Sequence, residues 1–196
     1  MDDLLDSLNA ELERFGKSND ELHTDRSRRM HNITRDTGEF LSVLVRTILG
    51  RRVLEIGTSN GYSTLWLAEA AKSIGGSVTT IENSEFKIQL ASENFTRARI
   101  SSIINIIHGN AGEVLRGLGT GTFDLVFLDS ERKEYPGWWP DVRRALRPGG
   151  LLVVDNAISH PEEMAPLIAL VKTDLDFTTS LVPVGNGEFL AVKQPR

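Results

Sequence analysis

The chain has 196 residues, of which 40% are hydrophobic, with a formal net charge of −5 and no cysteine. This length supports one sizeable core and is short for two. The missing cysteines exclude disulfides, zinc–thiolate sites and cysteine nucleophiles. The acidic balance, without a long basic run, disfavours nucleic-acid binding by bulk charge.

The N-terminal stretch is acidic and amphipathic, unlike a secretory signal, and no apolar run approaches the roughly 20 residues that span a bilayer. We therefore expect a single cytoplasmic domain without a membrane partner. Residues 2–15 predict an amphipathic helix that breaks at Gly16, and residues 37–49 predict a second helix with a glycine after it. These segments form a helical cap, residues 1–50, ahead of a core, residues 51–196.

A basic cluster lies between the two predicted helices and consists of Arg26, Arg28, Arg29 and His31. Such a run usually forms a solvated face of the protein. The alternative is that the cluster grips an anionic substrate, and the residues alone leave that alternative open.

The core is organised around residues 53–64, VLEIGTSNGYST. An apolar strand stops at Gly57, Gly61 follows, and a helical pattern begins at Tyr62. A strand, a glycine turn and a helix N-terminus form a ligand site in many α/β proteins, because the backbone comes close to the ligand and free N–H groups face it. Ser63 can add a hydroxyl donor. The turn has neither the P-loop lysine nor the G-x-G-x-x-G spacing.

Strand and helix patterns alternate through the rest of the chain. We expect strands at residues 77–81, 103–107, 123–128 and 151–154, helices at 85–97, 111–118, 136–146 and 161–172, and closing strands at 177–182 and 188–192. This alternation predicts an α/β fold with a mostly parallel, doubly wound sheet. The two closing strands have no helix between them, so one of them must run antiparallel to its neighbour.

Polar residues stand at the carboxyl end of each predicted strand. Each one alone is better explained by a turn or a cap. Together, however, they lie at one edge of the sheet, where the carboxyl ends of parallel strands meet and ligands bind. Glu82 can accept both hydroxyls of a ribose. Asp129, Asp155 and Asn156 offer three oxygen ligands that suit a hard divalent cation such as Mg²⁺, although an Asx turn also explains the last two.

Trp138 and Trp139 follow this edge at helical spacing. We expect one of the two rings to pack in the core, rather than a platform for a flat substrate, since large aromatic side chains mostly serve packing. His160 lies after the predicted metal ligands, and either a pocket position or the start of a helix explains it.

The chain resembles a known family, the class I S-adenosylmethionine-dependent, cation-dependent O-methyltransferases of the catechol and caffeoyl-CoA type. The similarity spans residues 33–192, in the family's order, and is carried by ITRDTGEFLSVLV, VLEIGTSNGYST, TTIE, HGNAGEVL, FDLVFLDSERKEYPGWW and LRPGGLLVVDN. It implies a Rossmann-like, seven-stranded methyltransferase sheet with an antiparallel last strand. It also implies S-adenosylmethionine, a divalent cation, a small hydroxylated, catechol-like acceptor and a homodimer.

The resemblance also implies which residues form the site. The methionine part of the cofactor would lie near Ile33 and Glu55, the ribose at Glu82, and the adenine at Asn110 and Ala111. The remaining cofactor positions are Gly57, Thr58, Gly61, Tyr62, Ser63 and Asp129. The metal ligands would be Asp129, Asp155 and Asn156.

The chain departs from the family at two of these positions. Asn110 stands where the family often has aspartate, but it keeps an acceptor oxygen. Arg132 stands three residues after Asp129, where the family has its catalytic lysine, and arginine is a poor base because it stays protonated. The expected catalytic set is therefore Asp129, Arg132 and Lys133, with Arg132 stabilising an anion and Lys133 or water taking the proton.

Three other functions compete with this interpretation. Arg132 suggests a non-catalytic S-adenosylmethionine-binding protein, although such a protein has no need of Asp155 and Asn156. A nicotinamide-dependent dehydrogenase is disfavoured by the missing G-x-G-x-x-G. The basic cluster keeps open the methylation of a hydroxylated tRNA base, which the acidic balance weakens.

Overall fold

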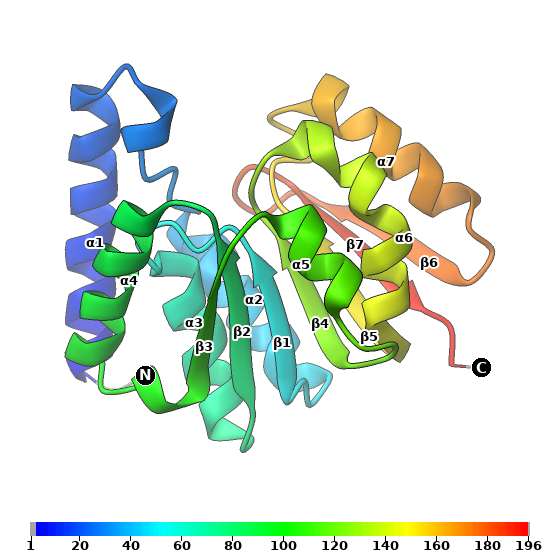
Figure 1. Ribbon diagram of the computed structural model, residues 1–196, viewed down its shortest axis with the longest axis horizontal. Coiled ribbons are helices and arrows are strands. Elements are labelled where there is room, and N and C mark those ends of the chain that lie inside the picture. Colours follow the sequence, from blue (N-terminus) through cyan, green and yellow to red (C-terminus); the bar gives the residue numbers. More distant parts are fainter. Residues whose placement is uncertain (1–2, 196) are drawn as a thin grey trace.

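Seven strands form one mixed sheet in the order β3-β2-β1-β4-β5-β7-β6, in a computed structural model that describes residues 3–195 (Figure 1). The strands are β1 (Arg52–Ile56), β2 (Ser77–Glu82), β3 (Ile104–His108), β4 (Phe123–Leu128), β5 (Leu146–Val154), β6 (Phe177–Val182) and β7 (Glu188–Lys193). The helices are α1 (Asp3–Leu22), α2 (Arg35–Thr47), α3 (Tyr62–Ser73), α4 (Glu85–Arg97), α5 (Ala111–Gly117), α6 (Tyr135–Ala145) and α7 (Pro161–Thr173). Short 3₁₀ turns are η1 (Arg26–Arg28), η2 (Ser101–Ile103) and η3 (Arg132–Glu134).

The first five strands are parallel, and β7 runs antiparallel to both β5 and β6. The reversal was expected, because the five residues between β6 and β7 are too few for a crossover back to the same edge. This confirms the predicted fold class, a mostly parallel doubly wound sheet with an antiparallel last strand.

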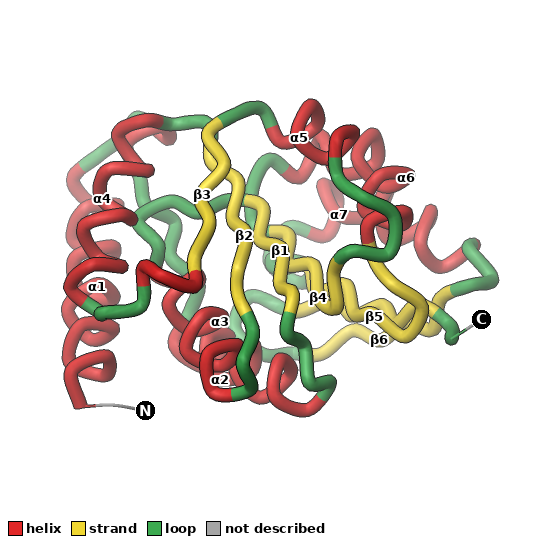
Figure 2. The backbone as a smooth tube through the Cα atoms, turned by 60° about the horizontal axis from the view of Figure 1, so that its bottom comes forward, coloured by secondary structure: helices red, strands yellow, loops and turns green. Residues whose placement is uncertain are grey.

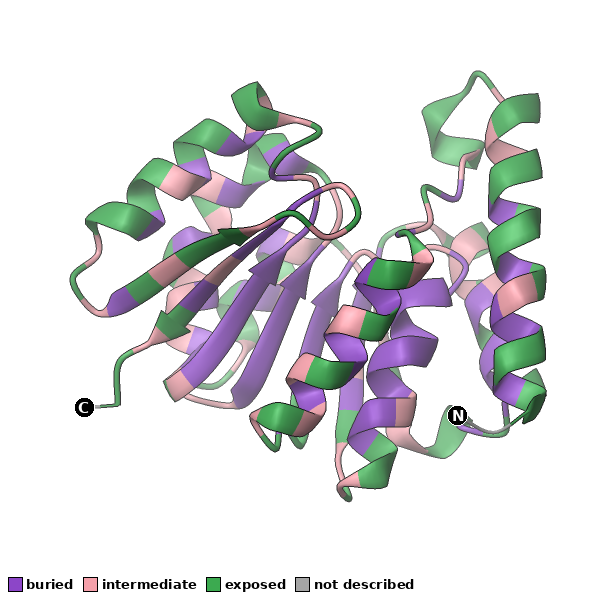
Figure 3. Cartoon of the chain, turned by 180° about the vertical axis from the view of Figure 1, so that it is seen from behind, coloured by how far each residue is buried: buried purple, intermediate pink, exposed green. Residues whose placement is uncertain are grey.

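Helices cover both faces of the sheet and divide the core into two clusters. Helices α1 to α4 pack with side chains such as Val53 and Phe127 on one face, and α5 to α7 pack with Leu54 and Val126 on the other. Figure 2 shows α2 and α3 on one side of the strands and α5 to α7 on the opposite side. The central strands are buried on both faces (Figure 3), which explains why they read as continuous apolar runs.

Side-chain caps fix where several helices begin, and Ser84, directly before the predicted helix at residues 85–97, is one of them. The Lys87 backbone N–H donates to Ser84 Oγ at 3.4 Å at the start of α4. Asn110 accepts from the Glu113 N–H at 3.1 Å at the start of α5. These caps satisfy N–H groups that have no partner inside the helix.

Helix α1 continues through Gly16 to Leu22, so the predicted break at Gly16 is wrong. A β-carbon at residue 16 would lie 2.4 Å from Asn32 Nδ2, which means that the glycine admits the Asn32 side chain against the helix. That amide donates to the Leu12 carbonyl oxygen at 3.0 Å. The glycine thus serves a close approach rather than a helix end. The first residue of the predicted helix, Asp2, lies outside the described residues.

Strand β5 begins at Leu146, five residues before the predicted start. Phe123 pairs with Leu146, whereas Leu125 pairs with Leu151, so the strand carries a bulge at residues that lie between the predicted helix 136–146 and the predicted strand 151–154. Gly149 has a φ of +73° in this bulge, a conformation that glycine adopts without strain. Arg147 Nε donates to Asp124 Oδ1 at 2.5 Å and fixes the bulge against β4.

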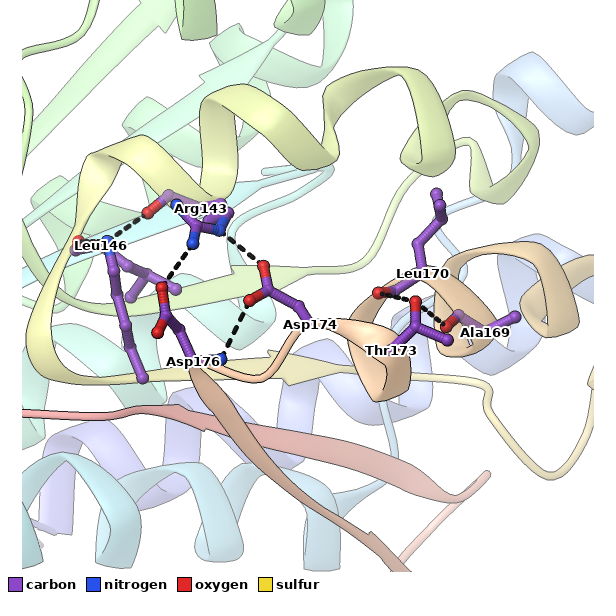
Figure 4. A network of polar contacts seen from close by, with 8 residues as sticks. Arg143, Leu146, Ala169, Leu170, Thr173, Asp174 and Asp176 are labelled. Atoms are coloured by element: carbon purple, nitrogen blue, oxygen red, sulfur yellow. Dashed lines mark hydrogen bonds and ion pairs between the residues drawn. The ribbon is translucent and has the colours of Figure 1, made fainter.

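An ionic cluster joins α6 to the turn before β6 (Figure 4). Arg143 lies 2.5 Å from Asp174 and 2.6 Å from Asp176. Lys193 of β7 donates to the carbonyl oxygens of Arg143 at 2.6 Å and Leu146 at 2.8 Å. The cluster anchors the closing strands from the side away from the cleft described below. Among residues 3–195, every helix is too short or too polar to cross a membrane.

Candidate functional site

A cleft of about 910 Å³ opens at the carboxyl ends of the parallel strands. Its floor is formed by the ends of β1, β2, β4 and β5. One wall comes from residues 26–33 and α4, and the other from the starts of α5 and α7 together with η3. This is the edge of the sheet where the sequence placed its polar residues.

The backbone ladder extends one residue past the strands, and this aligns their tips. Asp129 N–H bonds the Ile56 carbonyl at 3.0 Å, and Asp155 N–H bonds the Leu128 carbonyl at 3.1 Å. Gly57 N–H bonds the Ile81 carbonyl at 3.0 Å. Side chains that are far apart in the sequence therefore meet at one rim.

The turn between β1 and α3 depends on two glycines. Gly57 has a φ of +106°, and a β-carbon there would lie 2.1 Å from the Asp129 carbonyl oxygen. Gly61 precedes α3 with a φ of +86°, and a β-carbon there would lie 2.5 Å from the Phe95 ring. Both positions thus need a residue without a side chain. Gly57 lines the cleft, while Gly61 shapes the turn from behind.

Glu55 lies wholly buried beneath this turn and does not line the cleft. It accepts hydrogen bonds from Ser63 Oγ at 2.5 Å, from Thr80 Oγ1 at 2.7 Å and from Thr64 Oγ1. Burial raises the pKa of Glu55 to about 7, although the three hydroxyls oppose the rise. Glu55 therefore braces the turn, and it occupies the Ser63 hydroxyl that the sequence assigned to the ligand.

The Glu82 carboxylate is held in place at the tip of β2. Oε2 accepts from the Ser59 N–H at 2.9 Å, and Oε1 accepts from the N–H groups of Asn83 and Ser84, both at 3.0 Å. The carboxylate lines the cleft. Charge-assisted hydrogen bonds to the backbone preorganise it as an acceptor for paired hydroxyls.

The two tryptophans have different environments. Trp139 packs in the core against Phe177, with ring centroids 4.9 Å apart. Trp138 lines the cleft together with Asn110 and Ala111. Its ring packs against that of Tyr135, with the ring centroids 5.7 Å apart. The expected core packing of one ring is therefore confirmed by Trp139, whereas Trp138 is partly buried against the same core and also lines the cleft. Helical spacing could not assign them, because adjacent residues point to different sides.

Asp129, Asp155 and Asn156 meet at the tips of β4 and β5. Asn156 Nδ2 lies 3.3 Å from Asp129 Oδ1 and 3.0 Å from Asp155 Oδ2. Asn156 has a φ of +69°, which asparagine tolerates better than most residues. Burial raises the pKa of both aspartates, and for Asp129 the negative charge of Asp155 adds to the rise.

This arrangement fits a hard divalent cation. Two buried carboxylates that repel each other are stabilised by a positive ion, and an amide oxygen at Asn156 completes a set of three oxygen ligands once the amide turns over. Within residues 3–195, no group of three or more His, Asp or Glu side chains is spaced to hold a metal ion. A cation held here would therefore need the Asn156 amide oxygen as its third protein ligand.

Arg132 is nearly buried beside the aspartates. Its Nε lies 3.1 Å from Glu163 Oε2, which ties η3 to α7. The Arg132 charge lowers the pKa of Asp129 and of Asp155, against the effect of burial. Lys133, in contrast, is exposed and does not line the cleft.

The remaining predicted residues are placed as follows. Ile33, Thr58, Tyr62, Ser63, Asn110 and Ala111 line the cleft, as do Asp129, Arg132, Asp155, Asn156 and His160. Glu55, Gly61 and Lys133 do not. The cleft thus brings together most of the residues that the resemblance implied.

Sequence reasoning missed Glu188, a fully buried residue at the start of β7. Thr37 Oγ1 donates to Glu188 Oε1 at 3.2 Å, while Oε2 is buried without a donor. Burial, followed by the negative charge of Asp155, raises the pKa of Glu188 to about 10, so this carboxyl stays protonated at neutral pH. An acid at a strand end looks like an ordinary surface residue, so the sequence carried no signal for it.

Comparison with known proteins gives the class to which this fold and cleft belong. The profile of the family described as O-methyltransferase matches residues 10–194. The chain belongs to this O-methyltransferase family.

Two curated relatives and one solved structure illustrate the similarity. The chain is 37% identical over 126 residues to the catechol O-methyltransferase of Mycobacterium tuberculosis, across 64% of this chain and 57% of that protein. It is 34% identical over 130 residues to the catechol O-methyltransferase of Niastella koreensis, across 65% of this chain and 58% of that protein. Both matches therefore span less than two thirds of the relative. The O-methyltransferase from Bacillus cereus, crystallised in complex with SAH, superposes with a TM-score of 0.82 at 25% identity, covering 96% of this chain and 91% of that one.

Proposed function

We propose that the chain is an S-adenosylmethionine-dependent O-methyltransferase that transfers a methyl group to a hydroxyl of a small, catechol-like acceptor with the help of a divalent cation. One observation carries the proposal. Asp129, Asp155 and Asn156 converge in the same cleft as the fixed Glu82 carboxylate and the Gly57 turn. A mere cofactor-binding protein has no use for the first three residues. The SAH complex of the Bacillus cereus relative supports the choice of methyl donor.

Each residue contributes by position. Glu82 is preorganised to accept the two ribose hydroxyls, and the Gly57 turn leaves room for the donor to approach the backbone. Ile33 and Tyr62 give apolar surface beside that turn. The methyl group passes directly from the donor sulfur to an acceptor oxygen. Holding the two atoms in line supplies several kcal/mol of the barrier reduction.

Asp129, Asp155 and Asn156 would hold the cation beside the acceptor. A bound cation of this kind lowers the pKa of a hydroxyl and stabilises the resulting oxyanion. Arg132 adds a permanent positive charge next to the same position but takes no proton, since its guanidinium stays protonated. The proton is therefore released to water or to the cleft-lining His160.

Methyl transfer to a panel of catechols, with Mg²⁺ or with a chelator, tests the proposal. We expect turnover with Mg²⁺, loss of turnover in chelator, and loss of Mg²⁺-dependent turnover in Asp155→Ala with SAH binding retained. Asp155→Ala that is fully active in chelator contradicts the metal role. Absence of methyl transfer to any catechol, with SAH bound, contradicts the proposed acceptor class. The homodimer and the cytoplasmic location remain predictions, and light scattering checks the first of them.

A further inference from the structure

Four basic side chains line the cleft on the wall formed by residues 26–33 and α4. Arg26, Arg29 and His31 come from the segment between α1 and α2, and Lys87 comes from α4 across from them. Two separate parts of the fold thus supply positive charge to one recess. The sequence left open whether the basic cluster forms a solvated face or grips an anion. Arg26, Arg29 and His31 of that cluster line the cleft, and Arg28 does not.

Three of these side chains, Arg26, Arg29 and Lys87, have no acidic partner of their own. Within residues 3–195, no ion pair involves Arg26, Arg29 or Lys87. The Nε of Arg29 is buried and lacks a hydrogen-bond partner. A buried donor without a partner is unfavourable, and structures usually satisfy it with water or a ligand.

Asp20 lines the same wall of the cleft, and its carboxylate is already engaged. Its carboxylate accepts the backbone N–H of Met30 at 2.6 Å and that of His31 at 2.9 Å, and it lies 4.0 Å from His31 Nδ1. This single charge offsets only part of the three permanent cations.

The positive charges are close enough to act on each other. Burial lowers the pKa of His31, and Arg29, Lys87 and Arg26 lower it further, against Asp20. The Lys87 charge also reaches Asp129 and lowers its pKa. Like charges gathered in a recess repel one another, and an anion placed between them removes that repulsion.

We propose that Arg26, Arg29 and Lys87 form a subsite for an anionic group, a carboxylate or a phosphate, carried by the methyl acceptor. This inference rests on the proposed function and narrows its acceptor to anionic catechols. The acceptor's diol would lie at the aspartate end of the cleft and its anionic group at the basic end. The methyl donor also carries a carboxylate, so the experiment must distinguish these two sources.

Caffeate and methyl caffeate form a matched pair of probes, since both carry the same catechol and only one carries a carboxylate. We expect the wild type to use caffeate with a kcat/KM at least about tenfold higher, the range for a hydrogen bond to a charged group. The double variant Arg26→Gln/Arg29→Gln should lose that preference and keep its affinity for SAH. Arg28→Gln is the matched control, because Arg28 belongs to the same turn but is exposed and does not line the cleft.

Three outcomes overturn the subsite. The first is equal use of acid and ester by the wild type, and the second is a preference for the acid that survives in the double variant. The third is a double variant that loses SAH affinity and keeps its preference for the acid, which assigns the cations to the donor's carboxylate. If no catechol is methylated, the proposed function fails, and calorimetry then tests the subsite alone. Caffeate should bind the SAH-loaded protein more tightly than the ester, by a margin that the double variant removes, and equal binding refutes the subsite.

Discussion

The guanidinium of Arg132 is held by Glu163, with Nε 3.1 Å from Oε2, and this ion pair fixes a permanent cation beside Asp129 and Asp155. A lysine at this position can give up its proton, whereas arginine cannot. The pair thus changes what position 132 contributes, from a base to a fixed charge.

Arg132→Lys should therefore retain most activity, because it keeps the charge, and Arg132→Gln should lose on the order of 100-fold in kcat, the usual loss for one stabilising donor. Lys133→Gln should stay within about twofold of the wild type, because Lys133 lies outside the cleft. Steady-state kinetics of the three variants decides between the two residues. A large loss in Lys133→Gln alone identifies Lys133 as the base.

The turn that we propose to face the methyl donor should not accept a side chain at residue 57. Gly57→Ala adds a methyl group 2.1 Å from the Asp129 carbonyl oxygen, so we expect a loss of several kcal/mol in unfolding free energy or a failure to bind SAH. Gly75→Ala is the control, because Gly75 also has a positive φ, +71°, but has open space around it. Its loss should be only the backbone strain, about 1 to 2 kcal/mol, with SAH affinity unchanged. Urea unfolding measures the stability of the two variants, and calorimetry measures their SAH affinity. Equal effects of Gly57→Ala and Gly75→Ala in both measurements contradict the steric account.

Glu55 predicts a pH dependence of stability. Its pKa rises from 4.5 in the unfolded chain to about 7 in the fold, so the fold binds a proton that the unfolded chain releases between these values. The Glu55 contribution is thus complete below pH 4.5 and is lost as the pH rises through 7. Glu55→Gln has no such loss. The difference in unfolding free energy between the wild type and Glu55→Gln should therefore change by on the order of 3 kcal/mol across that range. Parallel curves of unfolding free energy against pH contradict the prediction.

Two substitutions of Glu188 should have opposite effects on the unfolding free energy. At pH 7 and without metal, the fold must protonate this carboxyl, which is unfavourable. Glu188→Gln removes that requirement and still offers Thr37 an acceptor, so its unfolding free energy should rise by about 1 kcal/mol or more. Glu188→Ala leaves a cavity and removes the acceptor of the Thr37 hydroxyl, so it should lower the unfolding free energy by about 2 kcal/mol. Destabilisation by both substitutions indicates that Glu188 is ionised.

Local signals in the sequence predicted much of the fold. The cap at Ser84, the helix start at Tyr62 and the antiparallel closing strand follow from capping, glycine turns and loop length, which act over a few residues. Because the first five strands are parallel, their carboxyl ends lie at one edge of the sheet. Glu82 and the two aspartates therefore had to lie at that edge. The errors at Gly16 and at the start of β5 have the opposite origin, because contacts from distant residues override the local preference.

The candidate site was predictable only in part, for the same reason. Strand ends located Asp129, Asp155 and Asn156, since the topology alone brings them together. The burial of Glu188 and the position of Arg29 at the cleft depend on which element packs over the rim. No spacing in the sequence encodes that packing. Glu55 lies in an expected position, but its three hydroxyl partners direct it into the core.

Binding of Mn²⁺ to the SAH-loaded protein, measured by calorimetry, tests the central claim most directly. We expect the wild type to bind one ion, and Asp155→Ala to bind it roughly 100-fold more weakly or not at all, with SAH affinity within about threefold. Unchanged Mn²⁺ affinity in Asp155→Ala, or no Mn²⁺ binding by the wild type, would show that the strand tips do not form a cation site beside the methyl donor.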